Sequence, residues 1–139
     1  MKVIFLIAGK GSRLNFLTKK KHKALLKINN EPIIRRLVNQ FHVLKVKSKD
    51  ITFITGYKRE QIKREFGKKY NYFYYKDYSK TNNLHTLINA NEVLKNQDTI
   101  ICFSDIITTD KTISVITDKR ISKITILTDL SKVRNGTMK

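Results

Sequence analysis

Lys2-Val-Ile-Phe-Leu-Ile-Ala8 is a largely apolar run that stops abruptly at Gly9-Lys-Gly-Ser-Arg-Leu14. A short apolar run bounded by glycine predicts a buried strand. Gly9 and Gly11 let the backbone approach an anion without a Cβ in the way, and successive N–H groups in such a turn can form an anion-binding concavity. A basic cluster at residues 19–23 follows at once. The stretch therefore predicts a strand that leads into a phosphate-binding loop.

The rest of the chain alternates predicted strands with predicted helices. Apolar runs predict four further strands, at residues 51–55, 70–75, 99–103 and 123–128. Helical patterns lie between them: one starts at Glu31-Pro32 with proline in its first turn, and two others cover residues 57–66 and 83–94. This alternation is typical of βαβ units and predicts an α/β fold with a mostly parallel central sheet.

The carboxyl ends of parallel strands are where ligands bind in folds of this class. Three segments follow predicted strands at that edge, namely residues 8–13, 56–57 and 104–105. They are far apart in sequence, but the fold is expected to bring them together. The sequence therefore predicts one binding rim, built around the glycine loop.

Length and cysteine usage limit the class of protein. With 139 residues, the chain is expected to form a single domain over residues 1–139. No apolar run reaches the roughly 18 residues that a membrane-spanning helix needs. The single cysteine, Cys102, lies within an apolar run, which predicts a buried, inert thiol in a cytoplasmic protein without disulfides or a zinc site.

The formal net charge of +18 predicts at least non-specific attraction to polyanions. Most of the excess is lysine, however, and it is spread along the whole chain. No recognition helix, aromatic RNA-binding motif or Cys/His finger is visible in the sequence. Nucleic acid is therefore not expected to be the main partner.

The glycine loop fits neither of the two common phosphate-binding motifs. Leu14 stands where the dinucleotide-binding fingerprint has its third glycine, and the Gly-Lys-Ser/Thr ending of the P-loop is absent. Taken alone, Gly-x-Gly after a strand is equally compatible with a plain tight turn. The interpretation of the loop therefore depends on what surrounds it.

Several blocks around and beyond the loop occur in one recognisable order. They are Leu6-Ile-Ala-Gly-Lys-Gly-Ser-Arg-Leu14, Leu17-Thr18, Lys23-Ala-Leu-Leu-Lys-Ile28 and Glu31-Pro-Ile-Ile34. At nearly the same intervals, they resemble the start of the nucleotidyltransferases that activate sugar phosphates and phosphocholine. The resemblance implies a three-layer, Rossmann-like nucleotidyltransferase fold, of which the usual C-terminal half is not evident in this chain.

Later blocks resemble the phosphocholine cytidylyltransferase-like branch of that family. Gly56-Tyr-Lys-Arg-Glu60 is similar to its Gly-Tyr-x-x-Glu segment, and Thr81-Asn-Asn-Leu-His-Thr-Leu87 to its Thr-Asn-Asn segment. Ile101-Cys-Phe-Ser-Asp105 resembles the acidic strand end of the wider family. The resemblance fades after Asp105.

The resemblance implies transfer of a nucleotidyl group to a phosphomonoester, with release of pyrophosphate. Arg13 and Lys23 would be the catalytic residues: Arg13 grips the pyrophosphate, and Lys23 stabilises charge at the α-phosphate and the acceptor. Asp105 would hold Mg²⁺ that bridges the phosphates. From the residues alone, Arg13 and Lys23 could be ordinary solvated cations, and Asp105 could simply cap a turn.

The resemblance also implies a set of nucleotide-binding residues in the first loop and near residue 80. They are Leu6, Ala8, Gly9, Gly11, Ser12, Arg13, Lys23, Asn82 and Asn83. The two asparagines carry both hydrogen-bond donors and acceptors, so they could read the edge of a pyrimidine. They could equally cap the helix that starts there.

Two residues depart from the family pattern within the first loop. His22 and Phe16 stand where the family usually has proline, and both changes are expected to loosen the loop. No histidine has a partner at metal-ligand spacing, and His42 is expected on the exposed side of its helix. The aromatic run at 70–75 is expected to pack in the core and at the sheet edge rather than to stack on bases.

The leading hypothesis is a Mg²⁺-dependent cytidylyltransferase that uses CTP and phosphocholine or a similar small phosphate. A hexose-1-phosphate nucleotidyltransferase is the close alternative, and a non-catalytic nucleotide- or polyanion-binding domain is the alternative from another class. The carboxylates Asp110, Asp118 and Asp129 do not form a recognisable second metal site.

The chain is shorter than the family members it resembles. We expect one of three explanations: an N-terminal fragment, a site completed by a partner chain, or nucleotide binding without full catalysis. A sheet edge left open by a missing half favours self-association. A homo-oligomer is therefore expected, and a stable monomer in size-exclusion chromatography with light scattering would count against it.

Overall fold

A computed structural model describes residues 1–94 and 98–117. The chain divides into two compact units, Met1–Thr108 and Thr109–Lys139. The first unit contains the sheet and every candidate site residue. In the second unit, the hydroxyl of Thr109 caps helix α6 (Asp110–Ile116) by accepting a hydrogen bond from the N–H of Thr112 at 3.2 Å. The strand predicted at 123–128 lies outside the described residues.

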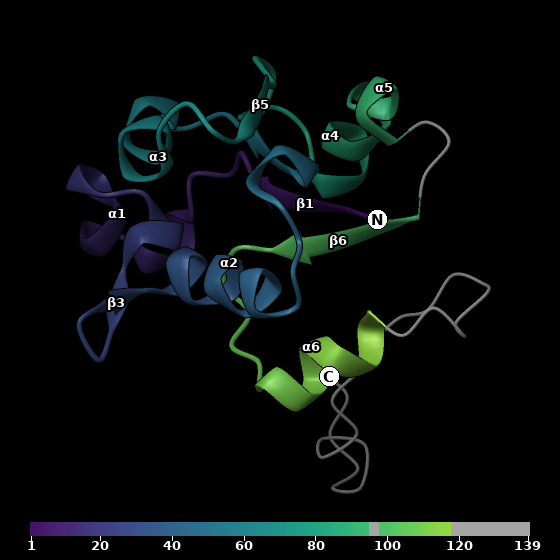
Figure 1. The fold of residues 1–139 in the computed structure, drawn as a ribbon. Helices are drawn as coiled ribbons and strands as arrows, with labels where there is room; N and C mark the ends of the chain where they lie inside the picture. Colours follow the sequence, from purple (N-terminus) through teal and green to yellow (C-terminus); the bar gives the residue numbers. More distant parts are fainter. Residues whose placement is uncertain (95–97, 118–139) are drawn as a thin grey trace, which may run out of the picture. The chain divides into compact units, whose positions relative to one another are not determined.

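The first unit is built on a parallel sheet of four strands (Figure 1). They are β1 (Lys2–Ile7), β4 (Ile51–Thr55), β5 (Asn71–Tyr74) and β6 (Thr99–Phe103). Their spatial order is β5-β4-β1-β6, and each neighbouring pair is parallel. This confirms the predicted mostly parallel sheet and four of its predicted strands. The two strands that flank the glycine-loop strand β1 are therefore β4 and β6.

Helices cover both faces of the sheet. Side chains of successive strand residues point to opposite sides, so buried strands such as β1 and β4 offer apolar side chains to helices on each face. On one face, Phe5 contacts Phe41 of α2 (Ile33–Val43), and Phe53 contacts Phe66 of α3 (Arg59–Phe66). On the other face, a core cluster joins β1 and β4 to α4 (Asn83–Asn89) and α5 (Asn91–Leu94); its buried members are Ile4, Leu6, Ile54, Tyr75 and Ala90. The three-layer arrangement is thus confirmed.

The helix predicted to start at Glu31-Pro32 begins slightly later. Pro32 belongs to a two-stranded antiparallel hairpin, β2 (Lys27–Ile28) and β3 (Glu31–Pro32), which the sequence analysis did not predict. Asn29 and Asn30 form its turn with φ values of 49° and 65°. Positive φ at both central residues characterises the type I′ turn, which asparagine tolerates well.

The two other predicted helices differ from their predicted limits for local reasons. Helix α3 begins at Arg59 rather than Tyr57, because the N–H of Tyr57 donates to the Ala8 carbonyl at 2.9 Å and Lys58 has φ +47°. The predicted helix over 83–94 is divided into α4 and α5 at Ala90. Two short helical segments in the loop after β1, η1 (Ser12–Leu14) and α1 (Phe16–Lys20), were not predicted.

His42 was predicted to be exposed, and this is wrong. Its ring is partly buried: Nδ1 lies 2.8 Å from the Val46 carbonyl and Nε2 lies 2.8 Å from the Tyr70 hydroxyl. Because a carbonyl only accepts, Nδ1 carries a proton and donates to Val46. The aromatic run 70–75 packs as predicted, since Tyr70 and Tyr75 are buried.

Cys102 is buried on β6, as predicted. Burial raises the pKa of its thiol to about 12, so the reactive thiolate is scarce at neutral pH. None of the described helices combines the length and the apolar character that crossing a bilayer requires.

Candidate functional site

The strand ends place the predicted rim segments beside one another. The N–H of Tyr57, after β4, donates to the carbonyl of Ala8, after β1, at 2.9 Å. Asp105 follows β6, which pairs with the other side of β1. The carboxyl ends of β4, β1 and β6 thus meet at one edge, with the glycine loop in the middle.

Gly11 is the residue that lets the loop lie against Lys23. Its φ is +67°, a conformation that residues with a Cβ rarely adopt. A Cβ built at Gly11 would lie 3.0 Å from Cδ and 3.1 Å from Cβ of Lys23, so the lysine stem occupies the space of the missing side chain. Gly9, in contrast, has open space where its Cβ would be.

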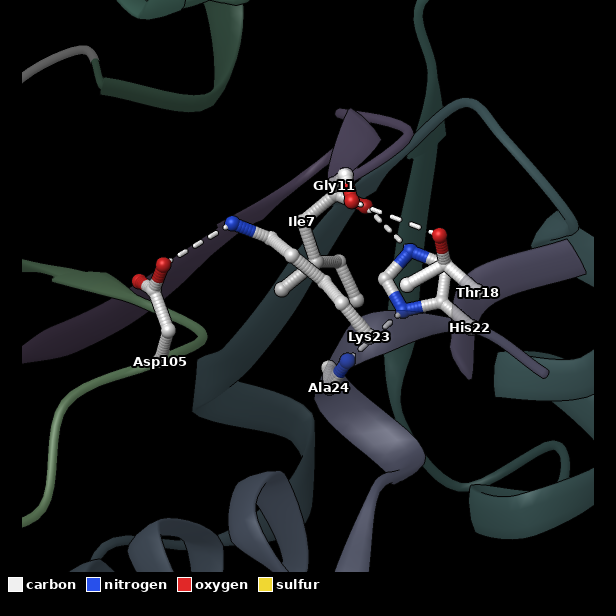
Figure 2. Close-up of polar contacts among 7 residues, drawn as sticks. All are labelled: Ile7, Gly11, Thr18, His22, Lys23, Ala24 and Asp105. Carbon is white, nitrogen blue, oxygen red and sulfur yellow. Dashed lines mark hydrogen bonds and ion pairs between the residues drawn. The ribbon is translucent and has the colours of Figure 1, made fainter. Parts of the chain in front are cut away.

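Lys23 and Asp105 form an ion pair across the rim (Figure 2). The ammonium Nζ lies 3.1 Å from Oδ2 of Asp105, although the two residues are 82 positions apart in sequence. The side chain of Lys23 is 20% exposed and that of Asp105 is 55% exposed. The lysine is therefore held along most of its length, while its charged end and the carboxylate remain open to a ligand.

The segment between the glycine loop and Lys23 is held by side chains of three residues. The hydroxyl of Thr18 lies 3.3 Å from the Gly11 carbonyl and 3.2 Å from the Asn15 carbonyl. The hydroxyl of Tyr57 donates to the Thr18 carbonyl at 3.1 Å. The amide of Gln61 donates to the Lys20 carbonyl and accepts from the N–H of His22, both at 2.8 Å.

Gln61 was missed by the sequence analysis. It lies on α3, about forty residues after the loop that it holds, and a glutamine on a helix rich in charged residues carries no signal of its own. The neighbouring Gly-Tyr-x-x-Glu block was the nearest available indication. In that block, Tyr57 is the residue that contacts the loop.

His22 was expected to loosen this loop, and the structure shows the opposite. The ring is fully buried. Its Nε2 lies 2.9 Å from the carbonyl of Ile7, and its Nδ1 accepts from the N–H of Ala24 at 3.1 Å (Figure 2). Because the Ala24 N–H is a donor, Nδ1 is unprotonated and Nε2–H donates to Ile7. The neutral histidine ties the turn η2 (Lys23–Leu25) to the end of β1.

Burial lowers the pKa of His22 from 6.5 to about 4. The hydrogen bond to the Ile7 carbonyl acts in the opposite direction, and the nearby charges of Lys23 and Lys58 lower the pKa further. Protonation would desolvate a cation and replace the lone pair that accepts from Ala24. The ring is therefore neutral over the physiological range.

The depressed pKa of His22 predicts an acid-dependent loss of stability. Between pH 6.5 and about 4 the unfolded chain binds a proton at His22 that the folded chain does not, so the free energy of unfolding falls as pH is lowered through this window. We expect this residue to contribute a slope of about 1.4 kcal/mol per pH unit at its steepest. Urea denaturation of wild type and His22→Gln at several pH values measures it as the difference between the two slopes. Parallel stability profiles would contradict it.

The remaining residues predicted in the first loop divide into exposed and buried groups. Ser12 and Arg13 lie in η1 and are exposed, so the guanidinium of Arg13 is accessible to an anion. Leu6 and Ala8 are buried, and the Leu6 side chain belongs to the core cluster. Any nucleotide contact of Leu6 would therefore be made by its backbone.

Asn82 caps helix α4, one of the two roles considered for it. Its Oδ1 accepts from the N–H of His85 at 3.1 Å. Asn82 and Asn83 are both exposed to solvent. Tyr78, four residues before Asn82, lies against Gly56 of the rim, since a Cβ at Gly56 would lie 2.5 Å from Cγ of Tyr78.

Asp105 fits a metal that is shared with a phosphate ligand. Within residues 1–94 and 98–117, no group of three or more His, Cys, Asp or Glu side chains could enclose a metal ion. Mg²⁺ does not require such an enclosure, because it is commonly bound by one or two carboxylates together with water and substrate phosphates. A single half-exposed carboxylate beside a glycine loop is compatible with that mode of binding.

A comparison with known protein families identifies the family of this chain. The profile described as nucleotidyl transferase matches residues 2–137, nearly the whole chain. The chain belongs to the nucleotidyl transferase family. Its parallel sheet, glycine loop and acidic strand end are thus features of a nucleotidyl transferase.

Two curated relatives of this chain are cytidylyltransferases. It is 36% identical over 100 residues to a choline-phosphate cytidylyltransferase of Streptococcus pneumoniae, in a match that covers 69% of this chain and 42% of the relative. It is 32% identical over 117 residues to a CTP:phosphoglutamine cytidylyltransferase of Campylobacter jejuni, covering 77% and 44%. The chain thus spans less than half the length of these relatives.

A solved structure supports the same relationship. This chain superposes on a CTP:phosphocholine cytidylyltransferase from Streptococcus pneumoniae with a TM-score of 0.64 and 31% sequence identity. The superposition covers 75% of this chain and 44% of that structure. The described fold therefore corresponds to somewhat under half of that enzyme.

Proposed function

We propose that this protein transfers a cytidylyl group from CTP to a small phosphomonoester such as phosphocholine. The observation that carries the proposal is the Lys23–Asp105 pair, which sets a cation and a carboxylate beside the glycine loop at the ends of three parallel strands. The cytidylyltransferase relatives support the choice of CTP. The proposal assigns the cytidylyltransferase activity in the names of those relatives to a chain that covers less than half of their length.

The chemistry assigns a role to each accessible group at the rim. A phosphate oxygen of the acceptor attacks the α-phosphorus of CTP, and the bond from that phosphorus to the oxygen bridging to the β-phosphate breaks, so that pyrophosphate leaves. Lys23 stabilises the charge on the α-phosphate, and Arg13 that on the departing pyrophosphate. Backbone N–H groups around Gly9 and Gly11 cradle the phosphates. Catalysis is then mainly positioning and neutralisation of charge.

Asp105 is the described residue that we propose to hold Mg²⁺. Bound Mg²⁺ would supply positive charge that neutralises the phosphates. In the structure, the carboxylate pairs with Lys23. The pair thus sets two groups side by side at the rim: a carboxylate that would hold the cation and an ammonium that would meet the α-phosphate.

Replacing Asp105 tests this proposal. We expect Asp105→Asn to lower Mg²⁺-dependent release of pyrophosphate about 100-fold, because the amide carries no charge to hold the cation. Asp98→Asn is the matched control: Asp98 is exposed and immediately precedes β6, at the end of the strand opposite to Asp105. The control should retain wild-type rates. Equal rates for all three proteins would contradict the assignment of Asp105.

The substrates are tested by a panel of CTP, UTP, ATP and GTP with phosphocholine and hexose 1-phosphates. CTP is expected to give the largest thermal shift, since tighter binding to the folded state raises apparent stability more. Turnover only with a hexose 1-phosphate would support the sugar-phosphate alternative. Nucleotide binding without release of pyrophosphate from any acceptor would identify a non-catalytic binding domain.

A further inference from the structure

His22 joins three parts of the fold at the base of Lys23. Its Nε2–H donates to the last carbonyl of β1, at Ile7, and its Nδ1 accepts from the N–H of Ala24. Its own backbone N–H donates to Gln61 on α3 at 2.8 Å. Lys23 stands between the two hydrogen-bonded positions 22 and 24, so its backbone is fixed on both sides (Figure 2).

The connection to β1 links Lys23 with the glycine loop. Ile7 pairs with Thr55 of β4 and directly precedes Ala8 and Gly9, so its carbonyl marks the point where the loop leaves the sheet. The ring of His22 therefore sets the distance between that point and the turn that carries Lys23. The stem of Lys23 then lies on Gly11, and its ammonium reaches Asp105.

The backbone at position 22 has the geometry of a proline. His22 has φ −63° and ψ 138°, and the preceding Lys21 is extended at φ −125° and ψ 142°. Proline fixes φ near this value and favours an extended residue before it. Here a histidine maintains that geometry by hydrogen bonds rather than by a ring closed on the backbone.

We propose that His22 is a positioning residue, which holds Lys23 in register with the glycine loop by bridging the Ile7 carbonyl and the Ala24 N–H. The test of this role by enzyme activity rests on the function proposed above. His22 is fully buried, so it acts through Lys23 and not on the substrates. Burial, helped by the nearby charges of Lys23 and Lys58, keeps the imidazole neutral, and its two hydrogen bonds hold it in place.

Three substitutions separate the two ring hydrogen bonds. The amide nitrogen of Gln can take the place of Nε2 and donate to Ile7, whereas the oxygen of Asn can take the place of Nδ1 and accept from Ala24. Ala removes both bonds. We expect His22→Ala to lower kcat about 10- to 100-fold, since a displacement of about 1 Å at a reacting group has effects of this size. His22→Gln and His22→Asn are each expected to recover part of the loss.

A double-mutant cycle distinguishes positioning from general stabilisation. In the Lys23→Met background, His22→Ala should change kcat less than threefold, because there is no ammonium left to position. The affinity for inorganic tripolyphosphate is measured for the same four proteins of the cycle, at a temperature where every variant is folded. This second readout does not depend on turnover, so the role of His22 is decided even if no acceptor yields pyrophosphate.

Two results would overturn the proposal. One is additivity of the His22 and Lys23 effects in both readouts, which would mean that His22 only stabilises the fold. The other is the absence of tripolyphosphate binding by the wild-type protein, because Lys23 would then have no anion to meet. Loss of wild-type turnover alone, with coupled effects on tripolyphosphate affinity, would reject the proposed function and retain the role of His22.

Discussion

Replacing Lys23 by methionine is expected to lower the rate of pyrophosphate release about 100- to 1,000-fold, the range typical for removal of one preorganised electrostatic contact to a transition state. Methionine retains an unbranched stem that can lie on Gly11, where Cδ and Cβ of the lysine now fill the place of a missing side chain. What the substitution removes is the ammonium, which lies 3.1 Å from Oδ2 of Asp105. The effect therefore reports the charge and not the packing.

A matched control is available in the same half of the chain. Lys27 is exposed on the β2–β3 hairpin, and Lys27→Met removes one positive charge away from the rim. We expect this variant to keep its kcat within a factor of about two, since exposed charges are screened by salt. Initial rates at saturating CTP and acceptor measure both variants. A similar loss in both would mean that overall charge, not the position of Lys23, determines activity.

Replacing Phe53 by alanine is expected to lower the free energy of unfolding by about 3–5 kcal/mol, the range measured for truncating buried aromatic residues. Phe53 is fully buried on β4, and its ring lies 5.5 Å from that of Phe5 and 4.6 Å from that of Phe66, centre to centre. Tyr70 and Tyr72 contact the same ring. Because these neighbours come from β1, α3 and the segment around β5, they cannot all close the resulting cavity.

Phe16→Ala is the matched control for this loss. Phe16 is 73% exposed on α1, so its removal should change stability by no more than about 0.5 kcal/mol. Urea denaturation at pH 7 measures both variants on the same scale. A loss below about 1.5 kcal/mol in Phe53→Ala would mean that the aromatic cluster can repack and is not the centre of this face of the core.

The parts of the fold that the sequence predicted are those with local causes. The strand β1 is a short apolar run that ends at glycine, and the carboxyl-end rule for parallel strands was enough to place Asp105 near the loop. The type I′ turn at Asn29-Asn30 also has a local cause, but its strands are only two residues each and gave no periodic pattern.

The errors in the sequence analysis concern side chains that hydrogen-bond to groups distant in sequence. His22 was predicted to loosen its loop because a histidine in place of proline has more backbone freedom. Its ring instead bonds to the carbonyl of Ile7, fifteen positions earlier, and no periodicity signals such a contact. His42 was wrongly predicted to be exposed for the same reason, since its partner Tyr70 comes 28 positions later in the sequence, after β4. Of the site residues, Gln61 could be found only from the structure.

The central place of β1 in the sheet affects how the protein is made. Val3 pairs with Ile51 and Lys2 pairs with Thr99, so β1 is synthesised before both of its neighbours and finds the second only after most of the first unit has been made. At about 5–20 residues per second, this wait lasts several seconds or more. Throughout that time a strongly apolar segment has no partner on one side. The glycine loop is therefore translated long before β6, and the strand that carries it is supported on both sides only once β6 has formed.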